Sequence, residues 1–131
     1  MSKFNTISYP EQFQVNNILV HEKLERELQD FFDTSGQKDD FARLYRTNLK
    51  ILSDLKNKCV TVRAKFEKLK NAKDIYSMKF KLKQNIRILF MFHQDGTILL
   101  LTAFYERESK DYSKAIDIAY ERLKQYKGWI K

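Results

Sequence analysis

Two adjoining apolar runs in the second half of the chain constrain its fold most. Ile86–Phe92 is broken only by Arg87, and Thr97–Phe104 is broken only by its two threonines. A Gln94-Asp95-Gly96 turn sequence lies between the runs, which predicts a pair of antiparallel β-strands. Alternate residues of a strand point to opposite faces, and here both faces are largely apolar. The sheet therefore needs cover on both sides, from a C-terminal helix, a partner protein or both.

Strict alternation assigns each residue of this region to a face. One face is expected to carry Ile86, Ile88, Phe90, Phe92, Ile98, Leu100 and Phe104, and the other Arg87, Leu89, Met91, Leu99 and Leu101. A strand is also predicted just before them, because Tyr76, Met78, Phe80 and Leu82 alternate with Ser77, Lys79, Lys81 and Lys83. The three strands form an antiparallel meander over about residues 74–104.

The first half of the chain has a helical period. Apolar residues recur at spacings of three and four from Val20 to Phe32 and again from Phe41 to Leu55, with Ser35-Gly36 between the two stretches. This pattern predicts a helical hairpin over about residues 20–57, preceded by an N-terminal strand. A last amphipathic helix is expected over about residues 112–127, capped by Asp111 or Ser113. The expected fold is α+β, with the hairpin packed on the small antiparallel sheet.

Length and composition exclude several classes of protein. A chain of 131 residues fits one domain, spanning 1–131. No apolar run approaches the roughly 18–20 residues of a membrane span, and the first five residues lack a signal-peptide pattern. Cys59 has no disulfide partner and reads as a core residue, and two histidines make no metal site. We expect a cytoplasmic protein with no membrane association and no cofactor.

Positive charge is concentrated in one part of the chain. The net charge is +8, but residues 1–40 carry four basic and eight acidic side chains. Residues 56–87 hold eleven Lys or Arg against Glu67 and Asp74. Such a segment favours a polyanionic partner, because neutralising phosphates releases condensed counterions. A merely solvated basic face is the alternative that charge alone leaves open.

Several segments in the second half resemble one toxin superfamily. They are Leu69–Phe80, Asn85–Phe92, Gly96–Phe104 and the helical stretch Ala115–Ala119. Their order and spacing are similar to the C-terminal half of RelE/HigB toxins, in particular phage-derived HigB-like members. The likeness covers about residues 63–126. It implies a RelE-like fold and a ribosome-dependent mRNA endoribonuclease, the toxin of a type II toxin–antitoxin system.

The resemblance also implies partners and a chemistry. The partners are a cognate antitoxin, in a possible hetero-oligomer, and the ribosome with its messenger RNA. The ribose 2′-OH would attack the adjacent phosphate, which needs a base, charge stabilisation and an acid. Members of this superfamily often use Lys, Arg and Tyr for these tasks.

Carried over position by position, the resemblance names site residues. Arg87 would contact the scissile phosphate, Lys79 stands where an Arg is usual, and Arg107 would add a second basic contact. Tyr112 would stack on a base or transfer a proton, although core packing is its competing interpretation. The RNA-binding lysines would be Lys68, Lys70, Lys81 and Lys83. Where HigB-like members carry a Lys-Lys pair, this chain has Tyr105-Glu106-Arg107-Glu108, so two carboxylates dilute the basic site.

Two other functions stay open at this point. A ParE-like relative would poison DNA gyrase by binding rather than cut RNA. A non-catalytic basic nucleic-acid-binding protein would only grip phosphates with its positive strand face.

Overall fold

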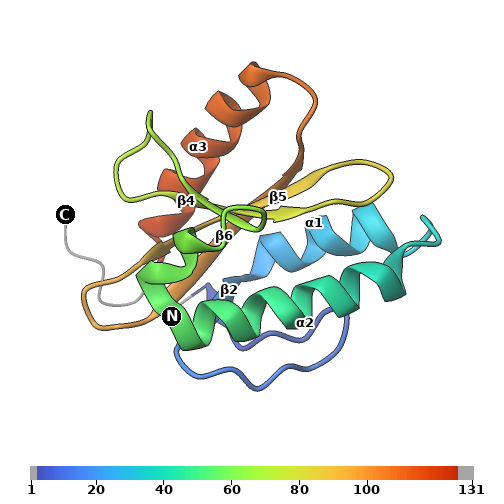
Figure 1. Ribbon diagram of the computed structural model, residues 1–131, viewed down its shortest axis with the longest axis horizontal. Coiled ribbons are helices and arrows are strands. Elements are labelled where there is room, and N and C mark those ends of the chain that lie inside the picture. Colours follow the sequence, from blue (N-terminus) through green and yellow to red (C-terminus); the bar gives the residue numbers. More distant parts are fainter. Residues whose placement is uncertain (1–2, 127–131) are drawn as a thin grey trace.

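The computed structural model describes residues 3–126, except for the side chain of Ser109. The elements in chain order are β1 (Phe4–Asn5), β2 (Ile18–His21), α1 (Glu22–Phe32), α2 (Lys38–Leu55), the 3₁₀ turn η1 (Lys56–Thr61), β3 (Phe66–Lys68), β4 (Tyr76–Phe80), β5 (Ile86–Phe92), β6 (Ile98–Tyr105) and α3 (Ser109–Leu123). The strands form one sheet in the order β1-β2-β6-β5-β4-β3. Helices α1 and α2 lie on one face of the sheet, and α3 lies on the other (Figure 1).

The fold is α+β, but the expected arrangement of a helical hairpin on a three-stranded meander with one extra strand is wrong. The sheet has six strands and is mixed, because β2 runs parallel to β6 while the other neighbours are antiparallel. The N-terminal strand β1 has two residues, and the two strands that the sequence pattern does not predict are β2 and β3. The three residues of β3 are too few to show an alternating period. Val20, expected in a helix, lies in β2, because one residue at a helical spacing fits a strand equally well.

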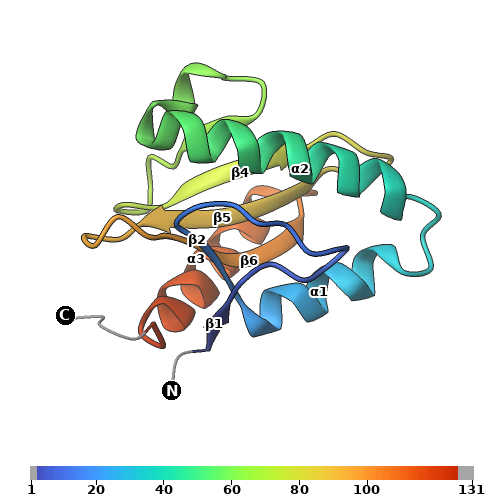
Figure 2. The same ribbon diagram turned by 90° about the horizontal axis from the view of Figure 1, so that it is seen from below.

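The first two helices are not packed as a hairpin on their own. Helix α1 lies mainly against β6, and α2 lies against β4 and η1. The segment between β1 and β2 contacts both helices and lies between them in Figure 2. The Tyr9 N–H donates to Glu25 of α1, and the Phe13 ring meets the Tyr45 ring of α2 edge-on. This N-terminal segment therefore fills space that a direct helix–helix contact was expected to fill.

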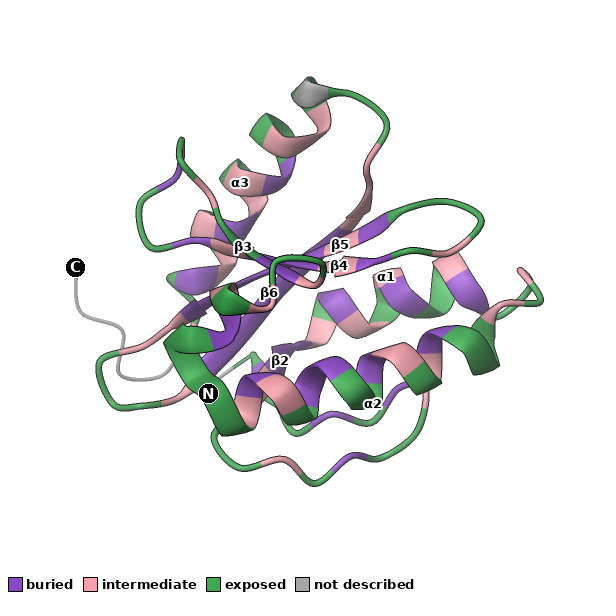
Figure 3. Cartoon of the chain, in the orientation of Figure 1, coloured by how far each residue is buried: buried purple, intermediate pink, exposed green. Residues whose placement is uncertain are grey.

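Strands β5 and β6 are buried on both faces, as the apolar runs indicate. Ile86, Ile88 and Phe90 belong to the core under α1 and α2, which also contains the fully buried Cys59. Burial raises the pKa of the Cys59 thiol to about 11. The opposite core holds Leu89, Met91, Leu99 and Leu101, which pack against Ala115, Ala119 and Leu123 of α3. Helix α3 is therefore the element that covers the second face of the sheet. In each helix the buried residues lie on the side that faces the sheet (Figure 3).

A register shift in β6 changes the face that its last residues occupy. Leu89 pairs with Thr102 and Phe90 with Leu100, so Leu101 is an extra residue in β6. Phe104 consequently packs on the α3 side, together with Leu99 and Leu101. Strict alternation had placed Phe104 on the opposite face, and that assignment is wrong. The bulge therefore decides which side chains at the end of β6 face α3.

Helix α3 begins three residues earlier than expected. Its N-cap is Glu108, and Asp111 lies inside the first turn, where its carboxylate accepts the N–H groups of Arg107 and Glu108. These hydrogen bonds lower the pKa of Asp111. The expected end at residue 127 lies outside the described residues. None of the helices within residues 3–126 combines the length and the apolar composition that a membrane span requires.

Burial of both faces of β6 predicts the cost of two neighbouring substitutions. Leu99 and Leu100 are fully buried in opposite cores. Leu99→Ala and Leu100→Ala should each lower the free energy of unfolding by about 2–5 kcal/mol, measured by urea denaturation. Leu55→Ala is the matched control, because Leu55 is 38% exposed and its truncation should cost about 0.5 kcal/mol or less. A small cost at Leu99 would show that α3 does not cover this face.

Candidate functional site

A hollow of about 440 Å³ opens beside the first turns of α3, on the α3 face of the sheet. It lies where β3, β4 and β5 meet the loop that follows β6. Its lining combines charged, amide and phenol groups with two apolar residues: Glu67, Leu69, Lys70, Asn71, Lys79, Arg87, Glu106, Tyr112 and Ile116. The hollow contains four of the residues expected at an RNA site, namely Lys70, Lys79, Arg87 and Tyr112.

Two of these cations come together through strand pairing. Lys79 of β4 and Arg87 of β5 are directly opposite each other in the antiparallel ladder, so their side chains share one face. Both are largely buried, with side-chain exposures of 23% for Lys79 and 13% for Arg87. Like charges directly opposite each other are unfavourable, and a carboxylate on each side of the pair offsets this repulsion.

Glu106 binds the Arg87 guanidinium most closely. The Arg87 Nε and Nη2 atoms donate to the same Glu106 oxygen, Oε1, at 3.0 and 2.7 Å. The third nitrogen, Nη1, lies 3.7 Å from Glu67 Oε1, too far for a hydrogen bond. Nη1 is buried and has no hydrogen-bond partner among the described residues. One edge of the guanidinium is thus held in place, while the Nη1 N–H groups lie buried beside Glu67 with their hydrogen-bonding capacity unused.

Glu67 lies on the β3 side of the same pair. Its Oε1 atom is 3.9 Å from Lys79 Nζ and 3.7 Å from Arg87 Nη1, so one carboxylate lies between two cations. Lys79 Nζ also donates to the Arg63 carbonyl at 3.4 Å. These contacts are long, and Glu67 is more exposed than the cations. Glu67 and Lys79 are therefore the more easily rearranged part of the hollow.

Tyr112 completes the site from the first turn of α3. Its hydroxyl donates to Glu106 Oε2 at 2.9 Å, and its ring lies 5.7 Å from the Arg87 Cζ atom and edge-on to Phe104. Burial raises the pKa of Tyr112, the hydrogen bond and charge of Glu106 raise it further, and the nearby Arg87 charge opposes them. Tyr112 therefore stays protonated near neutral pH. It can donate a hydrogen bond but cannot serve as a base.

The hollow can perform proton transfer and anion binding. Lys70, Lys79 and Arg87 supply positive charge, while Glu67 and Glu106 supply carboxylates that can accept a proton. The site is therefore close to electrically balanced, in contrast to the strongly basic segment around it. Among residues 3–126, no group of three or more His, Cys, Asp or Glu is arranged to hold a metal ion.

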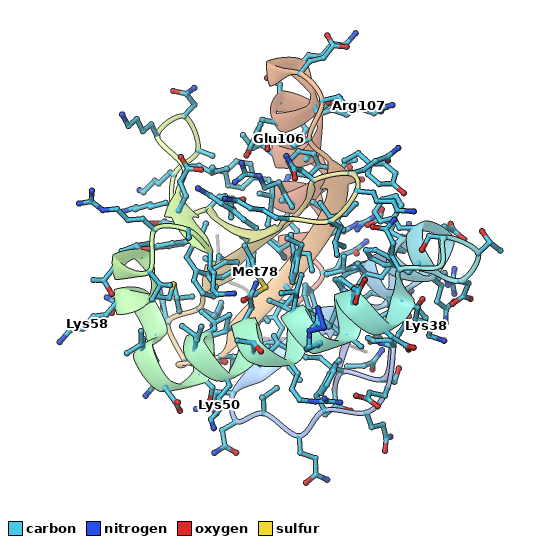
Figure 4. The ribbon with its side chains drawn as sticks, turned by 45° about the vertical axis from the view of Figure 1, so that its right-hand side comes forward. Lys38, Lys50, Lys58, Met78, Glu106 and Arg107 are labelled. Carbon is cyan, nitrogen blue, oxygen red and sulfur yellow. The ribbon has the colours of Figure 1, made fainter. Side chains whose placement is uncertain are left out.

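Four of the expected site residues lie elsewhere. Lys68 points to the opposite face of β3, where its Nζ lies 5.8 Å from the Tyr76 ring centre. Because β4 ends at Phe80, Lys81 and Lys83 lie beyond the strand and line a separate hollow beside the α1–α2 connection. Arg107 is exposed and projects from the loop after β6 (Figure 4), lining a groove that does not include Glu106.

The sequence alone does not reveal a role for the two carboxylates at the centre of the hollow. By sequence Glu106 only dilutes the basic site, but its N–H donates to the Asn85 carbonyl and thereby aligns it with the start of β5. Once Arg87 is paired with Phe104, Glu106 lies two residues further on the same face. The position of Glu67 cannot be predicted in the same way, because Glu67 lies in the three-residue strand β3, which has no sequence pattern of its own.

Comparison with known proteins gives one match. A family model described as "Phage derived protein Gp49-like (DUF891)" matches residues 35–124, more than half of the chain. The matched segment includes every residue that lines the hollow. This family is associated with RelE-like toxin–antitoxin proteins. The comparisons with curated proteins and with solved structures gave no match.

The two separate groups of cations predict different contributions to RNA binding. Arg87→Ala should weaken binding of a short single-stranded RNA and reduce the slope of log affinity against log salt by about one unit or less, because one phosphate contact is lost. Lys83→Ala is the matched control outside the hollow and should leave affinity and slope nearly unchanged. Fluorescence anisotropy at several salt concentrations measures both quantities. Equal losses in the two variants would mean that RNA is held by diffuse charge, not by the hollow.

Proposed function

The chain belongs to the phage-derived Gp49-like family, and we propose that it is the toxin of a type II toxin–antitoxin system that cleaves messenger RNA on the ribosome. The association of the family with toxin–antitoxin proteins supports the first part of this proposal and fits an antitoxin partner. One observation carries the second part: Glu106 is held between Arg87 and Tyr112 in a hollow that also contains Lys79.

The proposed reaction is an internal transfer within the RNA. The ribose 2′-oxygen attacks the neighbouring phosphorus, the bond to the 5′-oxygen breaks, and a 2′,3′-cyclic phosphate and a free 5′-OH result. The protein needs to take the proton of the 2′-OH, stabilise the charge on the phosphate and supply a proton to the leaving oxygen. It also needs to hold the attacking oxygen in line with the leaving one.

Glu106 is the proposed base. Its two oxygens are fixed by different groups, Oε1 by Arg87 and Oε2 by Tyr112, so the carboxylate is oriented before RNA binds. With Glu106 as the base, this step needs no Lys, Arg or Tyr of the kind that the resemblance implies. Tyr112 then acts as a positioning group for Glu106, consistent with its raised pKa.

Arg87 and the lysines are proposed to act on the phosphate. Nη1 of Arg87 is buried beside Glu67, so it can donate to a non-bridging oxygen once the Glu67 side chain moves aside, while the other two nitrogens keep Glu106 in place. Lys79, next to Arg87 in the ladder, adds positive charge as the phosphate gains electrons, and its ammonium group can give a proton to the leaving 5′-oxygen. Lys70 lies at the exposed rim, where it can steer the backbone into the hollow.

The narrower assignments belong to the same proposal. We place the chain with HigB-like toxins, acting as one domain over residues 1–131 in the cytoplasm, with the ribosome presenting the message. The charged residues of the hollow lie close together, so they can contact only a short stretch of RNA. This supports a requirement for the ribosome to hold the rest of the substrate in position.

Replacing Arg87 tests the proposed activity in cells and in extracts. Expression of the unaltered chain without its partner should arrest growth, and mapped messenger RNA ends in a translating extract should show new cuts. Arg87→Ala should relieve the arrest and reduce cleavage about 100-fold or more, because the phosphate and Glu106 both lose their partner. Lys50→Ala is the control, since Lys50 projects from α2 far from the hollow (Figure 4).

The same experiment separates the competing functions. Growth arrest with broken DNA and intact translation would contradict RNA cleavage and favour a gyrase poison. A fully folded Arg87→Ala protein with unchanged toxicity would reject the hollow as the active site.

Glu106→Gln separates chemistry from binding. The amide keeps the size of the side chain but cannot accept the 2′-OH proton, so cleavage should fall by about 10²–10⁴-fold. RNA affinity should stay the same or rise, because a negative charge beside the phosphate is removed. Single-turnover cleavage on programmed ribosomes and anisotropy measure the two effects. Unchanged cleavage would exclude Glu106 as the base.

A further inference from the structure

Strand β6 is longer than its neighbour on one side. β2 pairs with Ile98, Leu99 and Leu100 only, and the chain then leaves the sheet to start α1 at Glu22. β6 continues to Tyr105 and is paired on its other side with β5 along its whole length. Its last five residues therefore form an open edge inside the sheet, between α1 and α3.

The first part of this edge is closed by an ion pair. Arg122 of α3 and Glu27 of α1 form a two-point salt bridge at 2.9 and 2.7 Å. Arg122 Nη1 also donates to the Leu101 carbonyl, and Glu27 Oε1 accepts the Ala103 N–H at 3.4 Å. The two side chains thus take the place of a neighbouring strand at these backbone groups.

The rest of the edge has no such cover. The Ala103 N–H points away from β5, so the Ala103 carbonyl and the Tyr105 N–H, two residues on, point the same way. In the described part of the chain, neither group has a hydrogen-bond partner on this side. An edge with free backbone donors and acceptors is a template for an added strand.

A groove of about 240 Å³ runs beside this edge. Phe31 of α1 forms one wall, Ala115 and Ile118 of α3 form the other, and residues 102–105 form the floor. The Phe31 and Tyr105 rings contact each other, with centres 4.5 Å apart. The groove therefore offers apolar contacts on both sides of the free backbone groups.

The charges of the groove favour an acidic occupant. Arg107 and Lys114 line it, are exposed, and form no ion pair within residues 3–126. Its two carboxylates are already engaged, Glu27 by Arg122 and Asp111 by backbone N–H groups. A second copy of this chain, joined edge to edge, would bring the same cations together, which disfavours self-association.

We propose that the open edge of β6 at Ala103–Tyr105 is a docking site for an extended segment of a partner protein. The segment pairs with β6 as an added strand, places apolar side chains on the α1 side against Phe31, and presents acidic side chains on the α3 side to Arg107 and Lys114. No residue lines both this groove and the Arg87 hollow, although Glu106 and Arg107 are neighbours in one loop. Docking therefore does not depend on RNA cleavage.

The probe is a synthetic peptide of about eight residues, the usual length of a strand, in which valine alternates with glutamate. Titration into the full chain should give saturable binding by calorimetry, and hydrogen exchange at the Tyr105 amide should slow. A peptide with the same sequence but N-methylated at every second residue lacks the N–H groups for pairing and should not bind. A valine–lysine peptide should also fail, because its charge matches that of the groove.

Variants test the charge contribution. The double variant Arg107→Gln, Lys114→Gln should weaken peptide binding about tenfold or more, while the control Lys50→Gln, Lys58→Gln removes two exposed lysines elsewhere and should not (Figure 4). Arg87→Ala should leave peptide binding unchanged, so a failed nuclease proposal would not affect this result.

Three outcomes would overturn the docking site. They are equal binding of the N-methylated peptide, protection at residues of the Arg87 hollow instead of Tyr105, and sedimentation showing that the chain dimerises through this edge.

Discussion

Burial of the β5–β6 hairpin on both faces is the constraint on which the rest of the structure depends. Because neither face can meet water, helices have to lie on both sides, with α1 and α2 over one core and α3 over the other. Charged side chains are then restricted to the strand ends and outer strands, where this cover stops. Arg87 at the start of β5, Lys79 on β4 and Glu106 just past β6 all lie in that region, so the hollow forms where the second core ends.

Within the hollow, burial and charge oppose each other. A largely buried guanidinium is costly unless it is paired, and Arg87 is paired with Glu106 on one side and approaches Glu67 on the other. The carboxylates that reduce the net positive charge are therefore the groups that allow Arg87 to be held rigidly under α3. The same pairing leaves Nη1 without a partner and orients Glu106 through Tyr112. The proposed binding of an anion and the proposed acceptance of a proton thus depend on a single charge cluster.

Local sequence patterns predict most of the longer helices and strands and part of the site. The β4–β5–β6 meander and the amphipathic helices follow from apolar periodicity, and the pairing of Lys79 with Arg87 follows from adjacent strands in register. The short strand β3, the parallel pairing of β2 with β6 and the bulge at Leu101 have no such signal, since each depends on contacts between distant segments. The bulge decides which face of the sheet Phe104 and Glu106 occupy, and the pairing of β3 with β4 brings Glu67 into the hollow.

The sequence by itself determined that this chain needs a sheet covered on both faces and that its positive charge lies around residues 56–87. It did so because hydrophobic period and charge are local properties of the chain. Only the tertiary structure decided which cations share a hollow, that Lys68, Lys81, Lys83 and Arg107 lie outside it, and that an edge of β6 stays open. The physical reason is that side-chain direction depends on where each strand ends and bulges, and both are fixed by packing across the whole molecule.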